Sequence, residues 1–182
     1  MMIESPQDTK SEACLIFRSP AVRDAPAVHT LLKRCEGVDT NSRQSYLLLC
    51  EHFSSTCVVG EQNGRIVAFI SSYTLPERHD TLFVWQLAVD AELRGQGVAK
   101  RLFRHLLSRR NLKRIRYVEA MLDPANKVAR PLFEALAKEC HCEMGGLAGF
   151  PAEMFAGEEQ DSGYMVRVGP IGSVSKTLIG RR

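Results

Sequence analysis

The most constraining feature of the sequence is a glycine turn between an apolar run and an amphipathic helix. Residues 81–89 (TLFVWQLAV) are apolar along nearly their whole length, as in a strand that is covered on both faces. Residues 94–99 (RGQGVA) follow, and the next segment carries apolar residues at helical spacing with basic residues between them. Glycines let a backbone approach a ligand closely, and the amides that open a helix bind phosphate. The pattern predicts an α/β fold in which this turn holds a pyrophosphate.

Two other glycine motifs do not fit this turn. A dinucleotide-binding fingerprint needs G-x-G-x-x-G near the first strand, and a Walker loop needs Gly-Lys followed by Ser or Thr. Here the pattern is G-x-G-x-A after a late strand, without the lysine. A purely structural turn remains the alternative.

The charge is concentrated in the same region. The chain carries a net charge of +3, yet between Leu93 and Val118 it has nine Lys and Arg residues and no acid. Such a block marks a place where anions are held. A nucleic-acid surface would interleave aromatic residues on the basic face, and only Phe103 and Tyr117 lie nearby, at apolar-stripe or strand positions. We therefore expect no nucleic-acid partner.

The composition bounds the class of protein. Of the 182 residues, 45% are hydrophobic and 25% charged, which indicates one soluble globular domain. No apolar run reaches the roughly 18 residues that span a bilayer, and residues 1–20 lack the pattern of a secretory signal. We expect a cytoplasmic protein without a membrane partner.

The six cysteines lie mostly in apolar segments, so we expect reduced, buried thiols. Cys140-His141-Cys142 lacks a second ligand pair at zinc spacing, so we expect no metal and interpret it as an ordinary helix terminus.

Periodicity divides the chain into a flexible N-terminal segment (1–14), a single domain (15–170) and a C-terminal tail (171–182). Strands are predicted from residue 17 and over 57–61, 65–73, 81–89, 115–122 and 164–168, with an Asn63-Gly64 hairpin turn. Helices are predicted after an Asp24 N-cap, through Tyr46, after Gly97, and from an Asn126 cap to about Cys140. Loops are predicted over 38–44, 76–80 and the glycine-rich 145–149, with a lid near 150–157.

The spacing R-x-x-G-x-A after LAV resembles the coenzyme A loop of the GNAT acyltransferase superfamily. The segment N-x-x-x-x-x-L-F-E-x-L-A, at 126–137, resembles the next element of that superfamily. The resemblance implies a single-domain GNAT-like mixed sheet with splayed central parallel strands, flanked by helices. It also implies acetyl-CoA as the cosubstrate.

The resemblance further implies which residues hold that cosubstrate. The pyrophosphate would rest on Arg94, Gly95, Gln96, Gly97, Val98 and Ala99. Leu87 and Val89 would offer backbone groups to the pantetheine and the thioester, with the Val89 N–H as oxyanion donor, and Asn126 would contact the pantetheine arm. Lys100, Arg101 and Arg104 would attract the 3′-phosphate, unless this face is simply solvated.

Three longer strings narrow the resemblance. VDTNSRQSYLLLCEHFSSTCVV, TLFVWQLAV and YMVRVGP are similar to the diaminobutyrate acetyltransferases of ectoine biosynthesis, over roughly residues 17–170. That family implies acetyl transfer to the 4-amino group of L-2,4-diaminobutyrate, a small diamine, by a homodimer.

The same resemblance suggests residues for the diamine. Asp39 would pair with the ammonium that stays charged, and Asn41 and Gln44 would bond the carboxylate or fix the loop. Trp85 would form a wall of the pocket. The alternatives are that Asp39 or Asn41 caps the second helix and that Trp85 is a core aromatic. Simple alternation places Gln86 on the opposite strand face from Trp85, unless a bulge intervenes.

The catalytic acid and base are not evident. Many GNAT enzymes have a Tyr where this chain has Phe133, and no Glu opens the 81–89 run. The general base stays unassigned, with Tyr46, Tyr73 and His52 as weak candidates. Gln44 stands where relatives usually have Tyr, and the 158–164 segment is altered, which bears on substrate affinity. Alternative functions are acetylation of another small amine or a peptide N-terminus, or a non-catalytic CoA-binding module.

Overall fold

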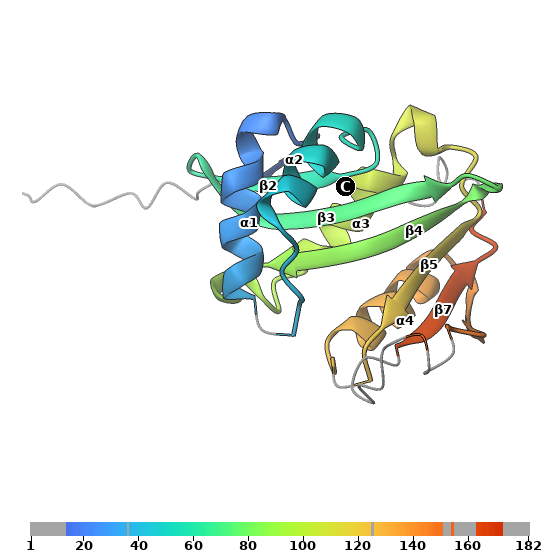
Figure 1. Ribbon diagram of the computed structural model, residues 1–182. Helices are drawn as coiled ribbons and strands as arrows, with labels where there is room; N and C mark the ends of the chain where they lie inside the picture. Colours follow the sequence, from blue (N-terminus) through green and yellow to red (C-terminus); the bar gives the residue numbers. More distant parts are fainter. Residues whose placement is uncertain (1–13, 36, 125, 151–153, 155–162, 173–182) are drawn as a thin grey trace, which may run out of the picture.

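The described part of the chain forms one seven-stranded mixed β-sheet in the order β1-β2-β3-β4-β5-β7-β6, shown in Figure 1. The computed structural model describes residues 14–35, 37–124, 126–150, 154 and 163–172. The strands are β1 (Ile16–Arg18), β2 (Val58–Gln62), β3 (Arg65–Leu75), β4 (Arg78–Val89), β5 (Tyr117–Leu122), β6 (Glu143–Leu147) and β7 (Tyr164–Gly169). The helices are α1 (Ala25–Arg34), α2 (Arg43–His52), α3 (Val98–Leu107) and α4 (Ala129–Glu139), with short 3₁₀ turns η1 (Val22–Asp24), η2 (Ala91–Leu93) and η3 (Arg110–Leu112). The predicted α/β class is confirmed.

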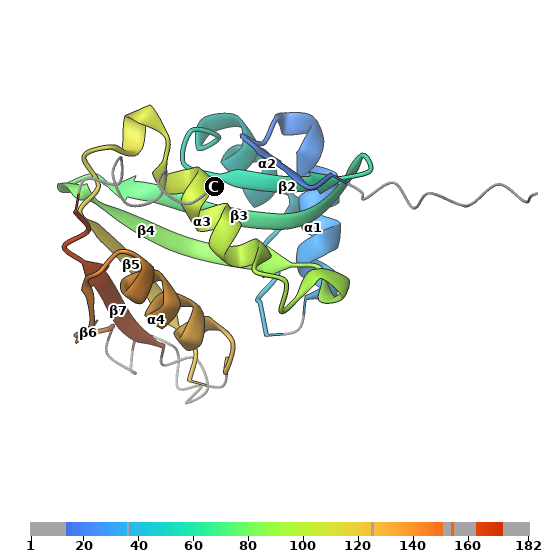
Figure 2. The same cartoon turned by 180° about the vertical axis from the view of Figure 1, so that it is seen from behind.

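Helices cover the sheet from both sides. In Figures 1 and 2, α1 and α2 lie on one face, and α3 and α4 lie on the other. Each pair has its own core. Leu31 and Tyr46 pack on Phe69 on the first face, whereas Leu102 and Phe133 join the larger cluster on the second. The two cores hold the central strands in place between them, as the apolar 81–89 run predicted.

The central strands β4 and β5 are parallel and separate along their length. Their ladder pairs only Thr81–Val84 with Tyr117–Ala120, although β4 continues to Val89. Figure 1 shows the two strands close at one end and diverging at the other. Beyond Val84, the backbone of β4 therefore loses its β5 partner. The splayed parallel pair implied by the family resemblance is present.

Two loop predictions are wrong. The 76–80 loop is a tight hairpin, because Leu75 pairs with Arg78 and β4 begins at Arg78. The guanidinium of Arg78 is held by Glu119 on β5, a contact that the polar run 78–80 does not reveal. The glycine-rich 145–149 stretch mostly belongs to β6, which pairs with β7 at the sheet edge. Glycine lowers strand propensity, but this backbone ladder overrides it.

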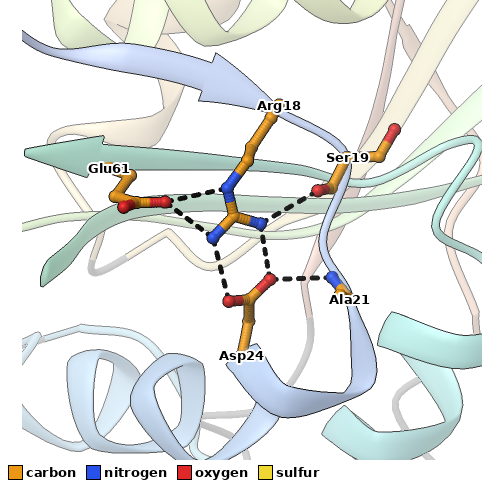
Figure 3. A network of polar contacts seen from close by, with 5 residues as sticks. All are labelled: Arg18, Ser19, Ala21, Asp24 and Glu61. Atoms are coloured by element: carbon orange, nitrogen blue, oxygen red, sulfur yellow. Dashed lines mark hydrogen bonds and ion pairs between the residues drawn. The ribbon is translucent and has the colours of Figure 1, made fainter. Parts of the chain in front are cut away.

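An arginine network fastens β1 to the rest of the sheet. Figure 3 shows Arg18 donating to Glu61 on β2 and, through two nitrogens, to Asp24 in η1, at 2.6 and 2.9 Å. The Asp24 carboxylate also accepts the Ala21 N–H at 2.7 Å. Asp24 is the N-cap residue of α1, as predicted, with Pro26 in the first turn, but its side chain makes no capping hydrogen bond. The nearby guanidinium and the Ala21 N–H engage it instead.

The cysteine prediction holds for three residues. Cys35, Cys50 and Cys57 are buried and free, whereas Cys14 is exposed and Cys140 and Cys142 are half-buried. Burial raises the pKa of Cys50 to about 12 and that of Cys57 to about 11, so these thiols stay protonated and unreactive. None of the helices in the described residues is long and apolar enough to cross a membrane.

Candidate active site

The glycine turn presents free amides at the start of α3. Gly95 and Gly97 have φ values of 75° and 73°, a left-handed conformation that favours glycine. Gly97 is the N-cap of α3, and no side chain of the described residues caps this end. The first helical hydrogen bond runs from Arg101 N to Gly97 O, so the amides of Val98, Ala99 and Lys100 precede the ladder. These N–H groups can donate hydrogen bonds to an anion, and the positive end of the helix dipole attracts it.

The neighbouring backbone of β4 also has groups that face away from β3. Asp90 N donates to Val67 O at 2.8 Å, so these two opposed residues form a hydrogen-bonded pair of the β3–β4 ladder. Such pairs alternate along an antiparallel ladder, and Ala68 faces Val89 in the next position. Leu87 and Val89 therefore turn their N–H and C=O groups away from β3, towards the gap beside β5. Val89 O accepts hydrogen bonds from Arg94 Nε at 3.4 Å and from Cys35 Sγ at 3.6 Å. The Val89 N–H and the backbone of Leu87 are therefore the groups that suit the predicted contacts to a thioester and its arm.

A β-bulge lies where β4 leaves β5. Ser71 pairs with Gln86 and Ser72 pairs with Val84, which leaves Trp85 as the extra residue. The buried Ser71 hydroxyl accepts the Gln86 N–H at 3.1 Å and thereby stabilises the bulge. Trp85 is 50% exposed, which excludes the core-aromatic alternative and leaves it beside the gap. The bulge reverses the strand's alternation, so Val84 and Leu87 contact the same core.

The polar loop after α1 is held across this gap by three side chains. Gln86 Nε2 donates to Asp39 O at 2.6 Å, and Asn126 Nδ2 donates to Gly37 O at 2.9 Å. The buried Tyr46 hydroxyl accepts the Asn41 N–H at 3.1 Å. Gln86 belongs to β4, whereas Asn126 follows β5. The loop therefore bridges the diverging ends of the two strands.

This loop and the first turn of α2 carry three of the residues predicted for the diamine. The side chains of Asp39 and Gln44 are exposed, and Asn41 is half-buried. Ser42 is the N-cap of α2, because its hydroxyl accepts the Ser45 N–H. The alternative that Asp39 or Asn41 caps α2 is therefore wrong.

The basic face of α3 is largely used within the fold. Arg101 stacks over the Phe17 ring at 4.9 Å and donates to Leu15 O, and Arg104 pairs with Glu139 of α4. Lys100 instead lines a shallow recess between α3 and α4, together with Phe103, Leu132, Leu136 and Glu139. Of the three basic residues predicted for the 3′-phosphate, Arg101 and Arg104 thus have partners within the fold, and Lys100 stays the candidate.

Comparison with known proteins gives the family. The acetyltransferase (GNAT) family profile matches residues 25–137. The L-2,4-diaminobutyric acid acetyltransferase of Bordetella parapertussis is 39% identical over 155 residues, covering 85% of this chain and 83% of that protein. The chain belongs to the diaminobutyrate acetyltransferase branch of the GNAT family.

Two further relatives of this branch agree. The L-2,4-diaminobutyric acid acetyltransferase of Halalkalibacterium halodurans is 37% identical over 160 residues, covering 88% of this chain and 84% of that protein. The structure of diaminobutyrate acetyltransferase EctA from Paenibacillus lautus, in complex with its substrate L-2,4-diaminobutyric acid and coenzyme A, matches with a TM-score of 0.83 and 33% identity. It covers 88% of this chain and 97% of that one.

As a GNAT protein the chain has a conventional cradle but lacks the usual acid. Phe133 is buried and packs edge-to-face on Phe103, with ring centroids 5.7 Å apart, so its ring belongs to the core. Among the weak base candidates, Tyr46 supports the loop. Burial raises the pKa of Tyr73, so its hydroxyl stays protonated and is poorly suited to accept a proton. His52 is exposed at the end of α2.

Sequence reasoning missed two residues of the site, Gln86 and Ser71. Both are polar and buried in strands that otherwise read as apolar. A glutamine inside TLFVWQLAV was the available signal, because a buried amide needs partners. Asn126 was predicted to cap this helix, but the N-cap of α4 is Val128. The Asn126 Oδ1 instead supports the turn that leads into α4, where it accepts the Val128 and Ala129 N–H groups at 3.1 Å.

Proposed function

We propose that this chain transfers the acetyl group of acetyl-CoA to the 4-amino group of L-2,4-diaminobutyrate. The product is N4-acetyl-L-2,4-diaminobutyrate, for the synthesis of ectoine, a compatible solute used in osmoprotection. The observation that carries the proposal is the likeness to EctA, which extends along 97% of that chain and was seen with both the diamine and coenzyme A.

The cosubstrate is held by backbone groups rather than by charged side chains. Arg94, Gly95, Gln96, Gly97, Val98 and Ala99 form the pyrophosphate turn. Leu87 and Val89 bond the arm and the thioester, and the direction of their backbone groups, away from β3, supports this role. Asn126 contributes from the other side of the gap. Both polar atoms of its amide are engaged here, so it acts by fixing the loop beside the arm.

The reaction needs a neutral amine and an oxyanion donor. The Val89 N–H lies at the diverging strand ends and stabilises the negative oxygen that forms when the amine attacks the thioester carbonyl, a contribution of about 3 kcal/mol for one such donor. Solvent protonates the leaving thiolate, because Phe133 has no proton to give. Asp39 pairs with the ammonium that is not acetylated, Trp85 forms the pocket wall, and Asn41 and Gln44 face the carboxylate.

The experiment is a product analysis with acetyl-CoA and L-2,4-diaminobutyrate. We expect CoA release and a product acetylated at N4, assigned by mass spectrometry and NMR. Acetylation at N2 would contradict the proposed position of transfer. Faster turnover with other small amines or with a peptide N-terminus would mean that diaminobutyrate is not the preferred substrate. CoA binding without turnover of any amine would leave a binding module.

Asp39 can be tested by its effect on the two Michaelis constants. Asp39→Ala is expected to raise the KM of the diamine about 10-fold or more while leaving that of acetyl-CoA nearly unchanged, because an ammonium loses its charged partner. Glu77→Ala, which removes an exposed acid at the β3–β4 hairpin, is the control. Equal effects on both constants would remove Asp39 from the pocket.

We also propose a cytoplasmic homodimer built from one domain, residues 15–170. Ile171 is buried against the larger core, so the domain reaches at least one residue further than predicted. The predicted segments 1–14 and 171–182 and the lid at 150–157 fall mainly outside the described residues.

In the described part of the chain no helix covers the face of β5 and β7 that carries Met121, which supports a dimer interface there. Sedimentation velocity should give twice the mass of the chain.

A further inference from the structure

Two buried polar atoms in and beside the loop at residues 37–41, here called the substrate loop, have no hydrogen-bond partner in the described structure. They are Oε1 of Gln86, an acceptor, and Nδ2 of Asn41, a donor. Leaving such a group unpaired typically costs about 1–3 kcal/mol, so buried orphans are rare and need an explanation. The two atoms belong to different elements, β4 and the loop before α2, and both elements meet at Asp39.

The orientation of the Gln86 amide is fixed by its other contacts. Gln86 is 7% exposed, its N–H is bound by Ser71, and its Nε2 donates to Asp39 O at 2.6 Å. Exchanging the amide nitrogen and oxygen would set two acceptors against each other at Asp39. Oε1 therefore remains an acceptor, held by the bulge next to the residue proposed to bind the ammonium.

At Asn41 the main chain, and not the side-chain amide, is held. Its backbone N–H is bound by the buried Tyr46 hydroxyl at 3.1 Å, which fixes the backbone from which the side chain projects. Gln86 on β4 and Asn41 on the loop thus offer one unpaired acceptor and one unpaired donor. An α-amino acid head group presents the complementary pair, an ammonium that donates and a carboxylate that accepts.

We propose that Gln86 Oε1 accepts a hydrogen bond from the 2-ammonium of the diamine, and that Asn41 Nδ2 donates to its carboxylate. The inference rests on the proposed function and names how that site selects an α-amino acid head. Gln86 shares the ammonium with Asp39 and also positions the loop through Nε2. Because both orphan atoms are shielded from water in this structure, the loop moves aside as the head group enters.

The test uses two analogues, each lacking one half of the head. 4-Aminobutyrate lacks the 2-amino group and 1,3-diaminopropane lacks the carboxylate, and both keep an amine for acetylation. The measured quantity is the ratio of kcat/KM for diaminobutyrate to kcat/KM for the analogue. This ratio cancels any general damage that loosening the loop does to all three substrates.

Gln86→Met should lower the ratio against 4-aminobutyrate about 10-fold or more and change the ratio against 1,3-diaminopropane much less. Asn41→Leu should do the reverse. Asn111→Ala removes a hydrogen bond from a side-chain amide to Ser55 O outside the site, and it should leave both ratios unchanged. If Gln86→Met and Asn41→Leu lower both ratios equally, or neither, the assignment is overturned.

Folding failure of Gln86→Met does not leave the assignment untested. Gln86→Glu keeps an acceptor for the ammonium and should retain discrimination against 4-aminobutyrate. If this variant loses the discrimination, the proposal is contradicted. L-2-aminobutyrate, which has the head group but lacks the 4-amino group, should inhibit the wild type competitively against diaminobutyrate. Absence of inhibition counts against a head-group site. A wild type that never acetylates diaminobutyrate would instead overturn the proposed function itself.

Discussion

The turn at Gly97 combines a backbone requirement with a ligand requirement. Its φ of 73° favours glycine, yet a Cβ there would meet nothing within 4 Å. A side chain at this position costs about 1 kcal/mol of backbone strain but has room. What it would occupy is the space in front of the α3 amides.

Gly97→Glu is therefore expected to raise the KM of acetyl-CoA at least 10-fold, because a carboxylate at the helix start takes the place of the pyrophosphate and repels it. Gly64→Glu is the matched control, since Gly64 has a φ of 72° and equally open surroundings in the β2–β3 hairpin. Steady-state kinetics should show the loss only at Gly97. Equal losses in both variants would mean that strain, and not phosphate binding, explains the effect.

At residue scale, the sequence predicted what depends on local pattern. The positive φ values at Asn63-Gly64 and at the RGQGVA turn follow from glycine and asparagine in the expected places. The partners of Gln86 did not follow. They depend on a one-residue bulge opposite Ser71, which apolar alternation cannot locate because the run 81–89 is apolar on both faces.

Between elements, Glu119 joins three strands. It is fully buried on β5, where Arg78 of β4 holds both of its oxygens at 2.6 and 2.8 Å and Arg167 of β7 donates to one of them. Burial raises the pKa of this carboxyl, but the two arginines outweigh it and hold the pKa below its usual 4.5. The group is therefore ionised in the folded protein.

Glu119→Gln is expected to lower the free energy of unfolding at pH 7 by about 2 kcal/mol, since both arginines lose a charged partner but reach water. Because the folded pKa is depressed, the stabilisation is complete above about pH 5 and is lost as the pH falls through the folded pKa. Urea unfolding in steps from pH 7 to about pH 3 should show the difference between the two proteins shrinking below about pH 5. Glu134→Gln, in an exposed pair with Arg130, should change little over this pH range.

Asn126 links α4 to the substrate loop, and its two roles can be separated. Asn126→Ala should lower the free energy of unfolding by about 1 kcal/mol through the lost bonds to the turn before α4 and also raise the KM of the diamine, because Gly37 O loses its donor. Asn126→Ser should restore the support of this turn but not the bond to Gly37. Thermal unfolding combined with kinetics checks this, and a serine variant with normal KM would show that the Gly37 bond is dispensable.

Element prediction succeeded where packing and periodicity agree. The apolar stripe of α3 and the buried 81–89 run were correctly assigned, because each buries a face whose spacing is visible in the sequence. The strand β6 was missed, since Gly145 and Gly146 lower strand propensity and its ladder with β7 is formed by backbone alone.

At the scale of the whole molecule, the backbone ladder that joins β1–β4 to β5–β7 in the described residues is four residues long on each strand. Past Val84, the two halves are connected on this side by the 37–41 loop, through Gln86 and Asn126. A ligand whose arm lies between β4 and β5 would contact both halves at once. Splaying of this kind costs backbone hydrogen bonds, which the arm would restore.

Hydrogen exchange can distinguish this arrangement from binding at the glycine turn alone. Saturating coenzyme A is expected to slow amide exchange in peptides from 84–99 and also from 118–127, because its pantetheine arm bonds the unpaired backbone on β4 and orders the facing end of β5. Adenosine 3′,5′-bisphosphate, which lacks the arm, should protect only the turn and the start of α3. If the bisphosphate protects 118–127 as strongly as coenzyme A does, the arm does not lie between the strands, and the acetyl group cannot be delivered beside Val89.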